Sequence, residues 1–284
     1  MIKSVKLLQI AVLLSLFTVL GFSIQSGSAK SNGKWLVLSK KDISQGAHHT
    51  NHFKIFSKYT SGNNLAVLKG IDKVQAKAMD GGGYFIGKDS VPTESPTYYE
   101  VKLFNNSLIT PPRHSSYCSG SSYSVLMETL NMILSKKGNK LSKDRLEALR
   151  MQEPDGGRRE DWIKYWGIWN ADGFGSQYAL VQYSGMGKEI KPEDARPGDF
   201  MNISWKTGIG HSVVFLGWYM DEDNKKNLVY WSSQKGTNGY GDQIVSLDRI
   251  KEVKIVRLTD PENLFNFDVA KAISKDVPGD KITW

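Results

Sequence analysis

The stretch RHSSYCSGSSY, residues 113–123, holds the only cysteine of the 284-residue chain. Small polar residues flank Cys118, so a substrate could approach its thiol. From Ser119 onward, apolar residues recur at helical spacing on one face, namely Tyr123, Leu126, Leu130, Ile133 and Leu134. The pattern predicts a buried helix whose first turn contains Cys118. Free N–H groups and the positive end of the dipole at a helix start favour the thiolate, which is the nucleophilic form.

A lone cysteine is also compatible with a role as an inert small apolar residue. The serine and tyrosine neighbours of Cys118 argue against that role, because inert cysteines sit among aliphatic side chains. If the protein is exported, as the N-terminal residues described below indicate, an unpaired thiol is a reactive group that the protein must either tolerate or use. We therefore expect Cys118 to be a nucleophile.

The first 29 residues have the pattern of an export signal. Lys3 and Lys6 precede an apolar run of 16 residues, 7–22, and residues 23–29 are small and polar. A secretory signal peptide over residues 1–29 is predicted, with a secreted or periplasmic protein beginning near Lys30. The alternative is an uncleaved anchor, but the run is shorter than the about 20 residues that span a bilayer. We expect no stable membrane insertion after cleavage.

The composition is that of a folded, basic protein, with 40% hydrophobic residues and a net charge of +8. An exported basic protein is attracted to anionic surfaces, of which the bacterial cell wall is one. The lysines are scattered and form no nucleic-acid reader motif, so we expect no nucleic-acid partner. We expect a monomer without a cofactor.

Residues 30–112 form a region that is either a separate appendage or part of the same domain. A strand is expected at 35–38, an amphipathic helix over 67–78, a flexible turn at 81–83, and strands at 84–86 and 98–104. His48, His49 and His52 are expected to be exposed and without a role. Nothing adjacent completes a metal-ligand set, so no metal is expected.

A thiol nucleophile needs a base and a third group that orients the base. His211 follows Gly210 at the mouth of a predicted strand, 212–220, which would hold the ring rigidly over a site at the sheet edge. His114 is the alternative base. An antiparallel return strand, 228–233, would bring Gln234 beside His211, and its amide oxygen could accept the imidazole N–H. Ser232 and Ser233 are alternatives for this third role.

Other residues are candidates for substrate binding. Backbone N–H groups at the start of the cysteine helix would hold the oxyanion, with Tyr117 or Tyr84 adding a hydroxyl. An aromatic-rich segment, 155–190, includes Trp166 and Trp169, which could pack in the core or form a groove wall beside the cysteine. Ser232 could line the same groove.

Three short blocks, in this order, are similar to the NlpC family of papain-like cell-wall peptidases and, more distantly, to the CHAP amidases. They are Cys118-Ser119-Gly120, then residues 196–200 (RPGDF), then residues 210–217 (GHSVVFLG). The resemblance implies an α+β, papain-like fold, with a central antiparallel sheet, the cysteine helix packed against it and an N-terminal extension. It implies a catalytic domain over residues 113–260, a tail over 261–284, and Cys118, His211 and Gln234 as the catalytic triad.

On this basis we expect a secreted cysteine hydrolase that cleaves an amide bond in peptidoglycan peptides. Two alternatives are a non-catalytic cell-wall-binding module that retains the fold, and a thiol-dependent acyltransferase. The chain departs from the family pattern in having Tyr117, where many members have aspartate, and in lacking the commoner histidine as third catalytic residue.

Overall fold

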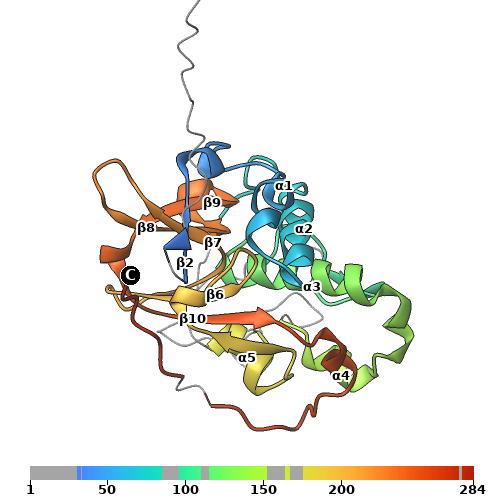
Figure 1. The fold of residues 1–284 in the computed structure, drawn as a ribbon. Coiled ribbons are helices and arrows are strands. Elements are labelled where there is room, and N and C mark those ends of the chain that lie inside the picture. Colours follow the sequence, from blue (N-terminus) through green and yellow to red (C-terminus); the bar gives the residue numbers. More distant parts are fainter. Residues whose placement is uncertain are drawn as a thin grey trace, which may run out of the picture.

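A computed structural model describes residues 31–32, 34–84, 96–109, 115–151, 164–166, 175–274 and 277–284. This part of the chain is α+β, as expected, with helices packed on a mostly antiparallel sheet (Figure 1). The expected signal peptide, residues 1–29, lies outside the described residues, as does Trp169.

The α-helices are α1 His52–Phe56, α2 Asn64–Gln75, α3 Cys118–Leu134, α4 Lys143–Ala148 and α5 Gly175–Gln182. The strands are β1 Ser31–Asn32, β2 Trp35–Leu38, β3 Lys102–Leu103, β4 Asn106–Ser107, β5 Gly187–Ile190, β6 Phe200–Trp205, β7 Gly210–Met220, β8 Lys226–Gln234, β9 Gly239–Ser246 and β10 Ile250–Leu258.

Strand β7 is the centre of an eight-stranded sheet in the described part of the chain. It pairs antiparallel with β6 and β8 and parallel with β2, while β9 extends the sheet beyond β8 and β10 lies between β6 and β5. The predicted hairpin is confirmed, with Val214 opposite Trp231 and Trp218 opposite Leu228. The end of β8 therefore lies beside the start of β7.

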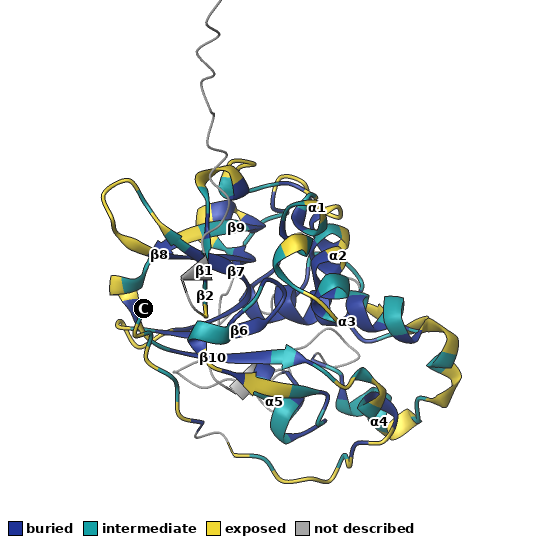
Figure 2. Cartoon of the chain, viewed as in Figure 1, coloured by how far each residue is buried: buried dark blue, intermediate teal, exposed yellow. Residues whose placement is uncertain are grey.

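The two faces of β7 enter different cores. Val214 and Leu216 belong to the core that contains the apolar residues of α2 and α3, whereas Val213 and Phe215 belong to a second core on the opposite face. This follows from the alternation of strand side chains. Figure 2 shows that the middle of the sheet and α3 are buried, while the tip of the β7–β8 hairpin is exposed.

The described residues of the region 30–112 contribute to the main core. Val67, Leu68 and Ile71 of α2 are fully buried in the same hydrophobic cluster as Leu126 and Leu130 of α3. Strand β2 is also part of the main sheet. These residues therefore pack as a part of the folded unit that carries α3.

A buried ion pair holds the RPGD turn, residues 196–199, in place before β6. Both Asp199 oxygens accept hydrogen bonds from Arg257, at 2.7 Å each, and the carboxylate also accepts from the Arg196 backbone N–H and from Asn64 Nδ2, at 2.8 Å each. Asp199 is fully buried, so its charge is neutralised by a two-point pair. One block of the family resemblance is thus explained by structure alone.

The glycines at 81–83 are closely packed rather than forming an open, flexible turn. All three have positive φ angles, between 77° and 94°, and Gly82 forms a bridge with Gly239. A Cβ on Gly81 would lie 2.3 Å from the Thr237 carbonyl oxygen. This close approach of two backbone segments leads the chain directly to Tyr84, which bridges Ser116 just before α3.

Most local predictions agree with the structure, with some exceptions. Within the expected strand 98–104 only residues 102–103 are β-structure, and Tyr84 forms an isolated bridge. Strands β5 and β9 were not predicted. The Gly239–Ser246 sequence of β9 contains two glycines and several polar residues, and so lacks a clear alternating pattern.

Candidate active site

Cys118 is the first residue of α3, as predicted, and follows Tyr117 in extended conformation. Gly120 is required in this turn, because a Cβ there would lie 1.5 Å from the Pro96 carbonyl oxygen. The next turn is held to the sheet by serines, since Ser122 Oγ lies 2.6 Å from Ser212 Oγ and Ser121 Oγ accepts from the Ser233 backbone N–H.

Residues three and four apart share a helix face. Cys118 lies one turn before Ser121 and Ser122 on the same face of α3. We infer that its side chain faces the sheet, as theirs do. This side meets the start of β7 and the end of β8, where the two predicted partners of the thiol are located. The residue is only 3% exposed, so the thiol is close to the sheet and largely covered.

A cavity of about 410 Å³ lies at these strand ends. It is lined by three predicted site residues, Tyr84, His211 and Gln234, together with Trp205, Ile209, Gly210, Tyr230, Lys235, Gly236, Gln243, Val245 and Arg249. Cys118 is not among the lining residues. It lies close enough to Tyr84 and Tyr230, however, for its charge to act on both hydroxyls.

The tyrosines of the cavity wall remain protonated. Burial, with a smaller contribution from the charge of Cys118, raises the pKa of Tyr84 to about 12. Burial also raises the pKa of Tyr230, against the opposing charge of Arg249. Both hydroxyls are therefore hydrogen-bond donors at neutral pH, which suits the predicted role of Tyr84 toward a developing oxyanion.

His211 is a neutral imidazole at neutral pH. Its ring packs between Trp205, at a centroid distance of 6.0 Å, and Tyr230, at 5.4 Å. Burial lowers the pKa of His211 to about 4, and Gln234 offsets only part of this effect. The Nε2 atom is buried and has no hydrogen-bond partner. The neutral ring therefore has an unused nitrogen that can accept a proton.

Gln234 has one amide atom fixed and the other unused. Its Nε2 donates to Thr237 Oγ1 and, at 3.1 Å, to the Gly241 carbonyl oxygen. Its Oε1 is buried without a partner. The amide is thus oriented with an acceptor unused, as the predicted orienting role requires, although neither His211 Nε2 nor Gln234 Oε1 completes a hydrogen bond.

The remaining predicted residues lie elsewhere. Tyr117 is buried and does not line the cavity. Ser232 is fully buried, and its hydroxyl donates to the Ser212 carbonyl oxygen at 2.7 Å. Ser233 Oγ lies 2.8 Å from Ser116 Oγ. The alternative base, His114, lies outside the described residues.

Trp166 is a core residue and not a groove wall. Its ring is fully buried, crosses Phe200 at 87°, and donates from Nε1 to the Ser119 carbonyl oxygen at 3.2 Å. The ring therefore supports the first turn of α3 from behind and has no surface on which a substrate could stack. Of the two readings of the aromatic segment, core packing is the one that fits this residue.

Sequence reasoning missed several residues of the cavity, including Trp205, Tyr230, Lys235 and Arg249. Trp205 and Tyr230 lie on the strands that flank β7, and both rings contact the His211 ring. The strand register alone would not show this, since it pairs His211 with Ile203 and Tyr230 with Phe215. Lys235 follows Gln234 directly. Arg249 ends the short 3-10 helix Leu247–Arg249 between β9 and β10, and no local sequence pattern indicated that it lies near His211.

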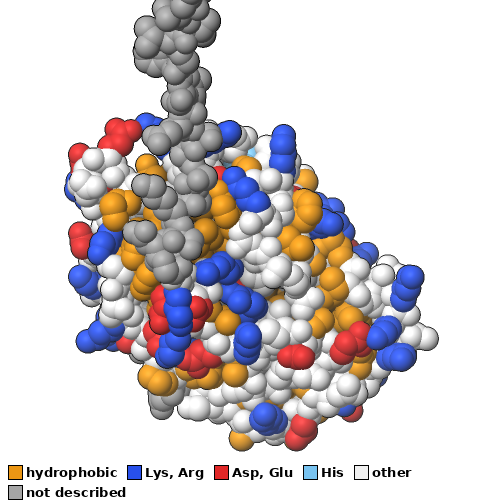
Figure 3. Space-filling model, in the orientation of Figure 1, with side chains coloured by type: hydrophobic (Ala, Val, Ile, Leu, Met, Phe, Trp, Pro, Cys, Tyr) orange, Lys and Arg blue, Asp and Glu red, His pale blue; other side chains and the backbone are white. Residues whose placement is uncertain are grey.

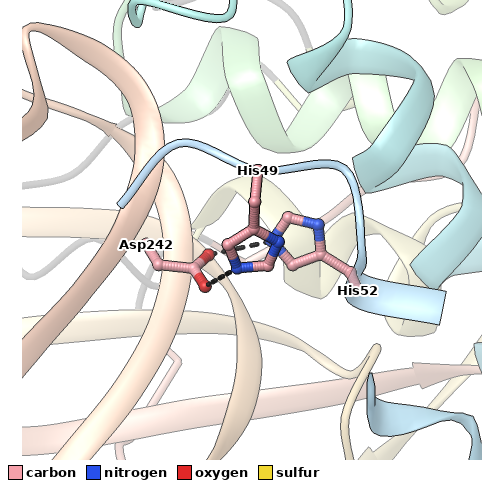
Figure 4. A group of neighbouring side chains, drawn as sticks. All are labelled: His49, His52 and Asp242. Atoms are coloured by element: carbon pink, nitrogen blue, oxygen red, sulfur yellow. Dashed lines mark hydrogen bonds and ion pairs between the residues drawn. The ribbon is translucent and has the colours of Figure 1, made fainter. Parts of the chain in front are cut away.

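The expectation that the N-terminal histidines are exposed is wrong for two of them. His52 is fully buried and His49 is 7% exposed. Figure 4 shows both rings pointing at Asp242 of β9, where His49 Nε2 lies 3.0 Å from one carboxylate oxygen and His52 Nε2 lies 3.0 Å from the other. Asp72 of α2 lies 2.7 Å from His52 Nδ1.

His52 is positively charged in this environment. Burial alone lowers its pKa, but the charges and hydrogen bonds of Asp242 and Asp72 outweigh burial and raise the pKa to about 9. Both ring nitrogens then donate protons. A buried imidazolium between two carboxylates joins α1 and α2 to β9.

Two histidines and a carboxylate could also form a metal site, but this geometry fits hydrogen bonding better. The ligand atoms of the three residues lie within 4.8 Å of one another. Each Nε2, however, lies 3.0 Å from a different oxygen of Asp242, so both nitrogens are used in hydrogen bonds to the carboxylate. The Asn51 backbone N–H donates to His49 Nδ1 at 3.2 Å, which places the His49 proton on Nε2. We assign no metal to this cluster.

Comparison with known proteins gave no match: no family model, no curated protein and no solved structure matches the chain. Within the described residues, no helix is both long and apolar enough to cross a membrane. The site therefore has to be interpreted from its own geometry.

Proposed function

We propose that this protein is an exported, papain-like cysteine hydrolase of the NlpC type that cleaves an amide bond in peptidoglycan peptides. In the proposed reaction, Cys118 Sγ attacks the amide carbonyl carbon while His211 accepts the thiol proton. The carbon–nitrogen bond then breaks, His211 returns the proton to the leaving amine, and water hydrolyses the resulting thioester.

One observation carries the proposal. The single cysteine lies at the start of a buried helix and faces the strand ends at which a neutral histidine with an unused Nε2 and a glutamine with an unused Oε1 line one cavity. The positive ends of the N–H groups at the start of α3 would stabilise the thiolate and then the oxyanion.

The basic charge and the predicted export signal support the choice of substrate, since a cell wall carries carboxylates and phosphates. Figure 3 shows Lys and Arg side chains spread over one face among Asp and Glu, without a continuous basic stripe of the kind that a nucleic-acid duplex requires.

Digestion of purified peptidoglycan, followed by mass spectrometry of the released peptides, tests the proposal. We expect wild-type protein to release peptides with a new amine and a new carboxylate, and Cys118→Ala to release none. A matched control, Ser44→Ala, changes an exposed serine of similar size in the described part of the chain and should digest as wild type does. Equal digestion by wild type and Cys118→Ala would refute the proposed nucleophile.

A second candidate is a non-catalytic wall-binding module, which the low exposure of Cys118 favours. It predicts that the protein sediments with purified cell walls and that neither wild type nor Cys118→Ala releases peptides. Product release by wild type alone excludes it.

A further inference from the structure

A second cavity, of about 560 Å³, lies where the β7–β8 hairpin, the start of β10 and residues 281–284 meet. Its lining includes five lysines, namely Lys206, Lys225, Lys226, Lys251 and Lys281. Among the described residues of its wall, Asp248 is the only acidic one. This lysine cavity shares no lining residue with the His211 cavity. An excess of positive charge around a hollow attracts an anion.

The charge of the lysine cavity is largely available to a ligand, because all five lysines are exposed. Lys225 Nζ lies 3.5 Å from Asp223 and Lys251 Nζ lies 3.2 Å from Glu252, and ion pairs of exposed lysines contribute little stability. Lys206 and Lys281 form no ion pair with the described residues. An anion could therefore bind without first displacing a strong internal partner.

The segment that closes one side of the lysine cavity is held in place. The backbones of Asp280 and Val253 exchange two hydrogen bonds, at 2.9 and 2.7 Å, which fixes the residues after Asp280 beside β10. The Trp284 ring stacks on Trp35, with a centroid distance of 6.1 Å and 27° between the planes. Lys226 Nζ donates to the Trp284 backbone oxygen and lies 5.7 Å from the centre of its ring. The lysines thus surround a formed wall.

The lysine cavity suits phosphate better than carboxylate. Every cation of its described wall is a lysine, and the planar fork of arginine, which matches a carboxylate, is absent from that wall. A lysine ammonium is a compact charge with three donors, so several can approach a tetrahedral phosphate from different sides. Trp284 and Ile282 add an apolar side, against which a carbon chain between two phosphates could pack. The volume lies within the usual range for ligand sites, about 300–1,000 Å³.

We propose that the lysine cavity is a second, non-catalytic site, which binds the phosphate groups of a linear polyol-phosphate polymer of the cell wall. The predicted export signal favours this polymer over a nucleic acid, since an exported protein meets the phosphates of the wall. The site uses neither Cys118 nor His211, so it goes beyond the proposed hydrolysis. Its role is to hold the protein on the wall, whatever reaction the His211 cavity performs.

Calorimetric titration of poly(glycerol phosphate) into the purified protein tests the site. We expect binding that 0.5 M NaCl weakens at least about tenfold, because binding to a polyanion releases its counterions. The double variant Lys206→Gln/Lys281→Gln should bind at least about tenfold more weakly at low salt. The control Lys54→Gln/Lys136→Gln removes the same charge from exposed lysines outside the cavity and should bind as wild type does. Equal losses in the two double variants, or no binding by wild type, overturn the proposal.

Two further probes fix the class of ligand. Polyglutamate of the same length should bind more weakly than the phosphate polymer, and equal affinity overturns the assignment to phosphate. Single-stranded DNA that binds more tightly, and through the same lysines, would overturn the wall polymer in favour of a nucleic acid. Cys118→Ala should bind poly(glycerol phosphate) as wild type does, so the result is independent of the proposed hydrolase.

Discussion

His211 and His52 are both buried, yet the structure gives their rings opposite charge states. His52 lies between the carboxylates of Asp72 and Asp242, which raise its pKa to about 9. His211 lies between aromatic rings and the neutral amide of Gln234, and burial lowers its pKa to about 4. The neighbours, and not burial itself, decide whether an imidazole carries a proton.

The difference explains why a neutral third residue suits this site. A carboxylate beside His211 would orient the ring, but it would also favour the imidazolium, as Asp242 does for His52. Gln234 can orient the ring while leaving it unprotonated and able to accept the thiol proton. We infer that the cluster at His52 has a structural role, whereas the cavity at His211 suits the proposed reaction.

The largest effect is expected from His211→Gln. Loss of a general base lowers kcat/KM by about 10²- to 10⁴-fold, and the substitution replaces a neutral buried ring with a neutral amide. Peptide cleavage by the purified variant measures this. His48→Gln, which alters a half-buried histidine outside the cavity, should retain wild-type activity, and comparable losses in the two variants would contradict the assignment.

Asp242→Asn should mainly affect folding. It removes one partner of the buried His52 imidazolium, which costs about 3–5 kcal/mol of the free energy of unfolding. Urea denaturation at pH 7 measures this cost. The control Asp223→Asn, at the exposed tip of the β7–β8 hairpin, should change stability by less than about 0.5 kcal/mol. If both variants lose stability equally, the charged cluster is not a structural element.

The pH dependence of stability should have opposite slopes for the two histidines. The pKa of His52 is raised from 6.5 to about 9, so the folded state binds the extra proton and its contribution is lost as pH rises through this window. The pKa of His211 is lowered from 6.5 to about 4, so the unfolded state binds the proton and stability falls as pH drops from 6.5 toward 4.

Urea denaturation between pH 4 and pH 10 tests both slopes. His52→Gln should flatten the alkaline slope and leave the acid one, while His211→Gln should do the reverse. Unchanged slopes in both variants would contradict the two charge states.

The smallest effect is expected from zinc. Since the stacked rings of His49 and His52 each donate a proton to Asp242, equimolar Zn²⁺ should not raise the Tm of the wild-type protein at pH 7. Differential scanning calorimetry with and without the metal checks this. A rise in Tm that disappears in His49→Gln would show that the cluster is a metal site.

Local sequence patterns were sufficient for much of the fold. The apolar spacing after Cys118 predicted the helix α3 with Cys118 in its first turn, and the two predicted strands on either side of the hairpin turn predicted how β7 meets β8. This pairing alone brought His211 and Gln234 together. Such features depend on neighbours within about 25 residues, where periodicity is informative.

The features that the sequence did not predict depend on contacts between residues far apart in the chain, which no local pattern encodes. Asp242 lies 190 residues from His52, so the carboxylate that determines the charge of this ring could not be identified from the sequence around it. The glycines at 81–83 gave a correct break after the helix but no sign of the close approach to β9. Trp166 had an ambiguous pattern, and only packing showed that its ring faces the core.

The central claim is that Cys118 and His211 act as one unit. Because the chain has a single cysteine, intact-protein mass spectrometry follows iodoacetamide addition to Cys118 without ambiguity. At pH 7 we predict that wild type is alkylated at least about tenfold faster than His211→Gln, since the neutral ring can accept the thiol proton as Sγ attacks. Equal rates in the two proteins would show that Sγ reacts as an isolated, buried thiol, and would contradict the account.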